Sequence, residues 1–332
     1  MRINNRVKKI MVLLLGSIMT IGVLLTGCGS SSSSGDASSS GVKVYYSTAT
    51  IDDFKQLLLD SLTEAASSEG ITLEVGVSDT VAEQSAAIKA AADSGYDVII
   101  CLAVDRTTAL QLEASAGDVP IVFVNVQPEA EYLEKDKYVM VGSYEMNAGG
   151  YQAEYVWNAL GCPSSINAVM LRGELSHNAA VSRTVSVTKY FEENGVDCNY
   201  VYYDTANWDT EEAAEAMRVF LKTGQSFDAV FCNNDSMAVG AVAALKEAGY
   251  DLSKIPVVGV DATAAGCQAI VDGEMQFTVY QSATDQGKMA LAAAKALATT
   301  GTCDGIEGLS EDGLCIWVPF EKVDATNVSD YM

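Results

Sequence analysis

The chain has few basic residues for its length. Its 332 residues include 20 Lys and Arg against 44 Asp and Glu, and the formal net charge is −24. A strongly acidic surface repels phosphate backbones and anionic headgroups, so nucleic acid and anionic lipid are excluded as expected partners. The acidic excess chiefly favours solubility.

The eight cysteines form no C-x-x-C pair and no zinc-type spacing, so no metal site is expected from them. Cys101, Cys232 and Cys267 lie in apolar runs and are predicted to be buried small hydrophobic residues. Four more lie nearer predicted loops, where pairing in an oxidising exterior stays open and unassigned: Cys162, Cys198, Cys303 and Cys315.

Motifs of enzyme chemistry are also missing. The sequence has no G-x-S-x-G elbow, no phosphate-binding glycine loop and no dinucleotide fingerprint. Acid–base catalysis by His177 with Asp204 or Asp261 is the alternative. Turnover of glycosides by the purified protein would support it. We expect a binding protein without a cofactor.

The N-terminus reads as a secretory signal. Four basic residues in the first nine positions precede an apolar run over 10–25, the layout of a signal peptide over 1–27. Its removal changes the net charge from −24 to −28.

Leu25-Thr-Gly-Cys28 resembles the lipobox of bacterial lipoproteins, which implies lipid on Cys28 and an anchor on the extracytoplasmic face of the cytoplasmic membrane. An ordinary signal peptide or a simple membrane anchor is the alternative. The Ser/Gly-rich segment to residue 41 is typical of a flexible tether.

From residue 42 onward, short β-type runs alternate with helical patterns, which predicts an α/β fold of two similar, doubly wound parallel-sheet lobes. Predicted strands cover 42–46, 72–77, 98–102, 121–124, 138–142, 166–171, 199–203, 229–232, 257–260, 277–280 and 314–320. Predicted helices cover 54–68, 81–94, 107–116, 147–160, 181–194, 210–223, 236–248, 263–272 and 285–300.

No Pro- or Gly-rich linker separates the two halves, so the chain is expected to cross between the lobes more than once. The predicted first lobe is 42–143 with 282–313, and the predicted second lobe is 144–281 with 314–332. A cleft between two such lobes is a common ligand site.

Polar residues follow the predicted strands directly, at the sheet edge where open α/β folds bind ligands. His177, the only histidine, and Arg183 follow one strand, and Trp208 lies between polar residues after another. Asn234, Asp261 and Gln281 each follow a further predicted strand. Helix capping is the simpler interpretation of each Asn or Asp taken alone.

Taken together these side chains suit a small polyhydroxylated ligand. They offer one indole face, a guanidinium fork, a carboxylate acceptor, and amide and imidazole groups. A sugar hydroxyl needs both donors and acceptors, and the C–H face of its ring packs on an indole.

The same residues carry a family resemblance over nearly the whole mature chain. Four motifs carry it, namely Gly173-Glu174 with His177 and Arg183, Asp204-Thr-Ala with Trp208-Asp-Thr, Asn233-Asn234-Asp235-x-Met-Ala-x-Gly240, and Val258-Gly-Val-Asp261-Ala. They resemble those of the type 1 sugar-binding proteins of ABC transporters, in particular the periplasmic galactose/glucose-binding proteins. The resemblance implies sugar contacts from Asp52, Phe54, Asn125, His177, Arg183, Trp208, Asn234, Asp261 and Gln281, with Asp52 and Phe54 matched only after a two-residue shift.

The chain departs from that pattern at three places. Ala179 stands where those proteins have a second Asp, and Val126 stands where they have Lys. The resemblance therefore does not establish galactose or glucose as the ligand. The segment 161–165 lacks alternating oxygen ligands, so no structural calcium is expected.

These features predict a monomeric, lipid-anchored receptor that binds a monosaccharide between its lobes and delivers it to an ABC permease. Presentation of the ligand to a chemoreceptor or sensor kinase, or binding of a polyol or nucleoside, is the alternative. A transcription regulator of the same fold would need a helix-turn-helix instead of the signal segment.

Overall fold

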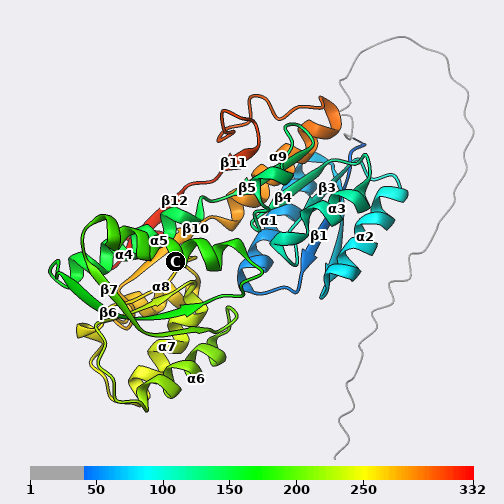
Figure 1. Ribbon diagram of the computed structural model, residues 1–332. Helices are drawn as coiled ribbons and strands as arrows, with labels where there is room; N and C mark the ends of the chain where they lie inside the picture. The colour runs from blue at the N-terminus through cyan, green and yellow to red at the C-terminus, as the bar shows by residue number, and fades with distance from the viewer. Residues whose placement is uncertain (1–40) are drawn as a thin grey trace, which may run out of the picture. The chain divides into compact units, whose positions relative to one another are not determined.

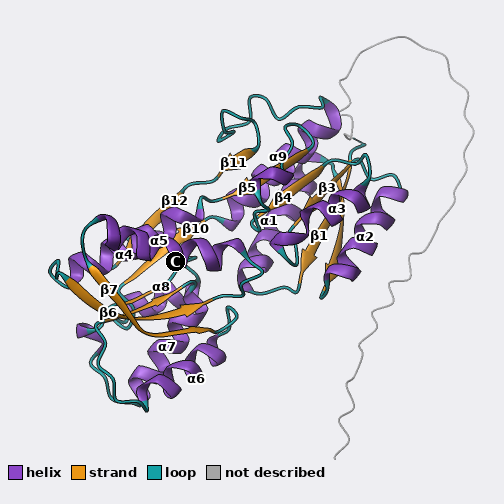
Figure 2. Cartoon of the chain, in the orientation of Figure 1, coloured by secondary structure: helices purple, strands orange, loops and turns teal. Residues whose placement is uncertain are grey.

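The computed structural model describes residues 41–332. The predicted signal peptide 1–27, the lipidation site Cys28 and the tether up to residue 40 lie outside the described residues. Over the described part the chain forms two six-stranded sheets (Figure 1) with helices against both faces (Figure 2). The predicted α/β class with two parallel-sheet lobes is confirmed.

The first sheet has the strand order β11-β5-β4-β3-β1-β2. Its strands are β1 (Lys43–Ala49), β2 (Thr72–Ser78), β3 (Val98–Cys101), β4 (Ile121–Val124), β5 (Tyr138–Gly142) and β11 (Cys315–Trp317). Its helices are α1 (Asp53–Glu69), α2 (Val81–Asp93), α3 (Ala109–Ala116) and α9 (Ala283–Thr299), with short 3-10 turns at Arg106–Thr108 and Ala130–Tyr132. The central strands β3 and β4 are buried throughout, which explains their unbroken apolar sequences.

The second sheet repeats this plan with the order β12-β10-β9-β8-β6-β7. Its strands are β6 (Ser165–Arg172), β7 (Asp197–Thr205), β8 (Ala229–Cys232), β9 (Val257–Val258), β10 (Phe277–Gln281) and β12 (Phe320–Asp324). Its helices are α4 (Glu145–Ala159), α5 (Asn178–Glu193), α6 (Thr210–Leu221), α7 (Asp235–Glu247) and α8 (Ala264–Val271), with 3-10 turns at Leu252–Lys254 and Val328–Tyr331.

The chain passes between the lobes three times, near Ser143, near Ser282 and at Val318-Pro319. The prediction that 314–332 belongs to the second lobe is wrong at its start. β11 runs parallel to β5 in the first sheet, with Cys315 opposite Met140, and only β12 joins the second sheet, antiparallel to β10. Pro319 separates the two strands, because it has no N–H for a ladder, so one predicted strand becomes two.

The seven cysteines of the described residues are all free thiols, so the pairing left open by the sequence is not formed. Cys303 and Cys315 are buried. Within residues 41–332, no helix combines the length and apolarity that a membrane crossing requires. The same residues contain no group of three or more His, Cys, Asp or Glu arranged to hold a metal ion.

Candidate binding site

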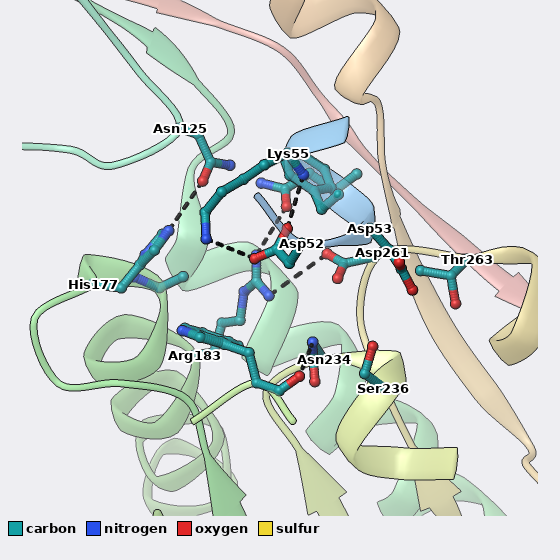
Figure 3. Close-up of a pocket in the computed structure, with 14 residues that line it drawn as sticks. Asp52, Asp53, Lys55, Asn125, His177, Arg183, Asn234, Ser236, Asp261 and Thr263 are labelled. Carbon is teal, nitrogen blue, oxygen red and sulfur yellow. Dashed lines mark hydrogen bonds and ion pairs between the residues drawn. The ribbon is translucent and has the colours of Figure 1, made fainter. Parts of the chain in front are cut away.

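A pocket beyond the carboxyl ends of the strands collects polar side chains from both lobes (Figure 3). It holds about 550 Å³ of free space, a volume that includes solvent at its open mouth. The lining comprises Asp52, Asp53, Phe54, Lys55, Asn125, His177, Ala179, Arg183, Trp208, Asn234, Ser236, Asp261, Thr263 and Gln281. All nine residues singled out in the sequence are among them.

The topology explains why residues so far apart meet. In each sheet the strand order reverses direction beside the first strand, at β1 and β3 in one and at β6 and β8 in the other. Ligands of open α/β sheets bind at this switch point, outside the carboxyl ends. Asp52 follows β1, Asn125 follows β4, and Asn234 follows β8. The loops that carry them therefore lie at the same edges.

His177 precedes α5 and caps it. Its Nδ1 accepts the N–H of Ala179 at 3.1 Å, and its Nε2 lies 3.0 Å from Oδ1 of Asn125 in the other lobe. Because Nδ1 accepts, the ring proton sits on Nε2 and is donated to Asn125. Burial, with Arg183 and Lys55 nearby, lowers the pKa of His177 to about 3. The ring is therefore neutral near pH 7.

Arg183 is the centre of the charged network and is 3% exposed. Its Nε donates to Glu145 Oε2 at 2.6 Å, Nη1 donates to the carbonyl of Asn233 at 2.6 Å, and Nη2 donates to Gln281 Oε1 at 3.2 Å. Burial opposes the guanidinium charge, but Glu145 and Asp261 outweigh it and raise the pKa of Arg183. The fork is thus held by the protein before any ligand arrives.

Asp261 faces the pocket from a turn that leaves the sheet after β9. Its side chain is 9% exposed, and the nearest cation is Arg183 Nη1 at 3.9 Å. Burial raises the pKa of Asp261 well above its usual range; Arg183 opposes this shift, and Asp235 and Asp52 reinforce it. No hydrogen bond from the described residues reaches this carboxyl group, and no cation lies closer than Arg183, so its oxygens are available to accept hydrogen bonds from a ligand.

Trp208 supplies the aromatic face. Its ring packs over Gly173, where a Cβ would lie 2.1 Å from the indole, and it meets the His177 ring edge-to-face with centroids 5.3 Å apart. Glycine at 173 is what allows the indole to lie flat on the strand end. Trp208 itself has φ +65°, an uncommon conformation for a bulky residue.

Capping and pocket lining are not alternatives at these positions. Asn234 caps α7 through Oδ1, which accepts the Met237 N–H at 3.0 Å, while its Nδ2 lies 3.4 Å from the Trp208 carbonyl. Asp52 caps α1 through Oδ1, and its Oδ2 accepts from Lys55 Nζ at 2.7 Å. Each side chain orders a helix with one atom and keeps another toward the pocket.

The departures from the galactose/glucose-binding pattern have structural consequences. Val126 is buried in the core of the first lobe and does not line the pocket. A second cation enters instead from α1, because Lys55 lines the pocket and bonds Asp52. Ala179 lines the wall without an acceptor.

Sequence reasoning did not identify five functional candidates. Asp53, Lys55, Ser236 and Thr263 line the pocket, and each lies within three residues of a predicted site residue. That proximity at a helix start was a usable signal. Glu145, which holds Arg183, lies 38 positions away from it, and nothing in its local sequence marks it.

Comparison with known proteins places the chain in a family. Residues 43–302 match the model of the periplasmic binding protein domain. A putative rhizopine-binding protein of Rhizobium meliloti is 32% identical over 293 residues, which cover 86% of this chain and 91% of that protein. The D-galactose/methyl-galactoside binding periplasmic protein of Haemophilus influenzae is 28% identical over 232 residues, 66% of this chain and 69% of that protein.

A solved structure is similar over nearly its whole length. The ABC transporter solute binding protein of Bacillus halodurans with bound myo-inositol matches with a TM-score of 0.76 and 29% identity, covering 88% of this chain and 98% of that one. The chain therefore belongs to the periplasmic binding protein family, and within it to the type 1 sugar-binding proteins.

Proposed function

We propose that this protein is the extracytoplasmic receptor of an ABC importer and that it binds a monosaccharide or a cyclitol of similar size in the pocket described above. The observation that carries the proposal is the convergence of Trp208, Arg183 and Asp261 on one cavity. The relatives named above are described as binding rhizopine, D-galactose or methyl-galactoside, and myo-inositol.

These three groups, with the amides of Asn234 and Gln281, divide the recognition of a polyol between them. The indole of Trp208 offers a flat apolar surface for ring C–H groups. Asp261 accepts from hydroxyl groups, and the Arg183 fork and the amides of Asn234 and Gln281 donate to ring or hydroxyl oxygens. Hydrogen bonds to charged groups contribute about 1.5 to 3 kcal/mol each, so a few of them reach the roughly 8 kcal/mol of micromolar affinity after association costs.

The state of His177 favours binding without turnover. Both ring nitrogens are engaged, and the low pKa keeps the ring neutral near pH 7. A catalytic acid or base works best with a pKa near the working pH. The imidazole is suited to orienting Asn125 and not to exchanging protons with a substrate.

We extend the proposal to the anchor. Lipid on the Cys28 thiol would hold a monomeric receptor at the outer face of the cytoplasmic membrane, with the Ser/Gly segment before residue 41 as a leash. Mass measurement of the protein from its native host would show the diacylglyceryl addition and the loss of residues 1–27. An unmodified Cys28 would refute the anchor and leave the binding proposal intact.

A thermal-shift screen followed by calorimetry tests the binding proposal. The panel should hold myo-inositol, D-galactose, other hexoses, pentoses and nucleosides, because a ligand that binds the folded state raises the melting temperature by mass action. We expect at least one neutral polyol to raise it in the wild type and not in the Asp261→Ala variant. Nucleosides alone shifting it would replace the proposed ligand class.

A further inference from the structure

Asp235 is buried beneath the pocket and does not line it. It is the first residue of α7 and is 0% exposed. Two glycines make room for its carboxyl group: a Cβ on Gly259 would lie 2.2 Å from Oδ1, and a Cβ on Gly266 would lie 2.2 Å from Oδ2. The carboxyl therefore occupies a slot that larger residues at 259 and 266 would close.

The two oxygens of Asp235 hold the segment that carries Asp261. Oδ2 accepts the N–H of Thr263 at 2.8 Å and its hydroxyl at 3.3 Å. Oδ1 accepts the hydroxyl of Thr278 at 2.6 Å, and that hydroxyl oxygen accepts the N–H of Ala262 at 3.3 Å. Asp235 thus holds both residues after Asp261. It bonds Thr263 directly, and it is linked to Ala262 through the Thr278 hydroxyl.

That segment has an unfavourable backbone conformation. Asp261 has φ +114° and Ala262 has φ +53°, and residues in such conformations persist only where the surrounding structure holds them there. The N–H of Asp261 donates to the carbonyl of Val279 at 2.7 Å, which ties the start of the turn to β10. Its end is tied to α7 and β10 by the bonds that lead to Asp235 and Thr278.

The acceptors of this turn are used by α8. The N–H of Cys267 donates to the Thr263 carbonyl at 2.8 Å, the N–H of Gly266 to the Thr263 hydroxyl at 3.1 Å, and Cys267 Sγ to the Ala262 carbonyl at 3.4 Å. The N–H groups of Ala262 and Thr263 donate toward Thr278 and Asp235.

We propose that Asp235 is a positioning residue of the binding site: it fixes the Asp261–Thr263 turn and thereby sets where the Asp261 carboxyl meets a polyol. The inference rests on the proposed function, because its measure is affinity for a polyol. Asp235 does not line the pocket, but it positions Asp261, which does.

A double-mutant cycle tests this coupling. Calorimetry should compare the wild type, Asp235→Ala, Asp261→Asn and the double variant, with the panel compound that binds the wild type most tightly. We expect Asp235→Ala to weaken binding about tenfold or more in the wild-type background and about twofold or less in the Asp261→Asn background, because coupled residues are not additive. An equal loss in both backgrounds would overturn the proposal.

Gln84→Ala is the matched control. Gln84 is also 0% exposed and anchors a loop of the first lobe, where it accepts the Val104 N–H at 2.8 Å and donates to the Leu102 carbonyl at 2.9 Å. None of these three residues lines the pocket. We expect this variant to lower the melting temperature and to keep wild-type affinity. If Asp235→Ala behaves in the same way, Asp235 is only structural and the proposal is wrong.

Two milder variants keep the test open if Asp235→Ala does not fold. Asp235→Asn retains the shape and can still accept from Thr263 and bond Thr278, so it should rescue most of the affinity. Thr278→Val removes the hydroxyl between Asp235 and Ala262 and should weaken binding while Asp235 stays in place. Wild-type affinity in Thr278→Val would contradict the proposal. If no panel compound binds the wild type, the proposed function itself fails.

Discussion

The second lobe contributes a buried, internally bonded wall to the pocket, whereas the first lobe contributes a more open one. The Arg183 and Glu145 side chains of the second lobe are 3% and 2% exposed, but Asp52 of the first lobe is 44% exposed and has one ion pair, with Lys55. The comparison teaches that the second lobe presents a preorganised surface, which lowers the ordering cost of binding.

The open wall has a different use. Side chains near solvent adjust at little cost, so we expect Asp52 and Phe54 to engage the ligand when the lobes close around it, with Lys55 holding the Asp52 carboxylate. A ligand shifts an open–closed equilibrium only through contacts that differ between the two states. In this account the second lobe sets affinity and the first lobe couples binding to closure.

The largest expected effect is on stability, from the buried ion pair of the second lobe. Glu145→Ala leaves the Arg183 charge buried without its 2.6 Å partner, so the free energy of unfolding should fall by about 3 to 5 kcal/mol. Urea denaturation measures this. Lys55→Met, which breaks the Asp52 pair of the open wall, should change it by less than about 1 kcal/mol. Equal losses from the two variants would remove the contrast between the walls.

The pH dependence of stability is the second test. Burial raises the pKa of Asp235 from its ordinary 3.8 to about 7, against the opposing bonds from Thr278 and Thr263 and the charge of Arg183. Asp261, Cys232 and Cys267 are the other titratable groups in electrostatic contact with it.

Between pH 4 and 7 the unfolded chain has released this proton and the folded chain keeps it. The contribution of Asp235 to the free energy of unfolding therefore falls as pH rises through this window, by at most about 4 kcal/mol, and is constant outside it. The difference between wild type and Asp235→Asn in urea titrations at several pH values isolates this contribution. A difference independent of pH would show that Asp235 titrates normally.

Ligand affinity gives the third test of the preorganised wall. Trp208→Ala and Asp261→Ala should each cost at least about 2 kcal/mol of polyol affinity with little loss of fold. Calorimetry against the best panel compound gives the affinity, and circular dichroism checks the fold. Asp272→Ala, which removes an exposed carboxylate at the end of α8, is the matched control and should bind like the wild type. Normal binding by either pocket variant would contradict the site.

The smallest expected effect belongs to the open wall. Lys55→Met should weaken binding by less than about 1 kcal/mol, because its pair with Asp52 lies partly in solvent, where ion pairs contribute little. Lys55→Arg keeps the charge and should lie between wild type and Lys55→Met. A loss larger than that of Asp261→Ala would assign the main recognition to the first lobe and reverse the comparison.

The sequence predicted the elements well because their signals are local. Apolar runs such as 121–124 and 229–232 match the observed strands β4 and β8 residue for residue. Several pocket residues could also be located from the sequence. Trp208, Asn234 and Asp261 follow strands whose carboxyl ends face a shared edge, whereas only the family resemblance points to Asp52 and Phe54.

What the sequence could not show depends on three-dimensional contacts. The split of 314–320 between two sheets is decided by pairing with β5 and β10, which no local pattern contains. Glu145 and Asp235 support the site through bonds to Arg183 and to Thr263. Their importance follows from packing and not from their neighbours in the chain. Their burial and these bonds distinguish them from ordinary acidic residues at helix starts.

A crystal structure of the protein with the tightest-binding panel compound tests the central claim most directly. We expect the ring of the compound to pack on the Trp208 indole, with its hydroxyl groups bonded to Asp261 and the Arg183 fork. A compound bound elsewhere, with these three side chains untouched, would contradict the account.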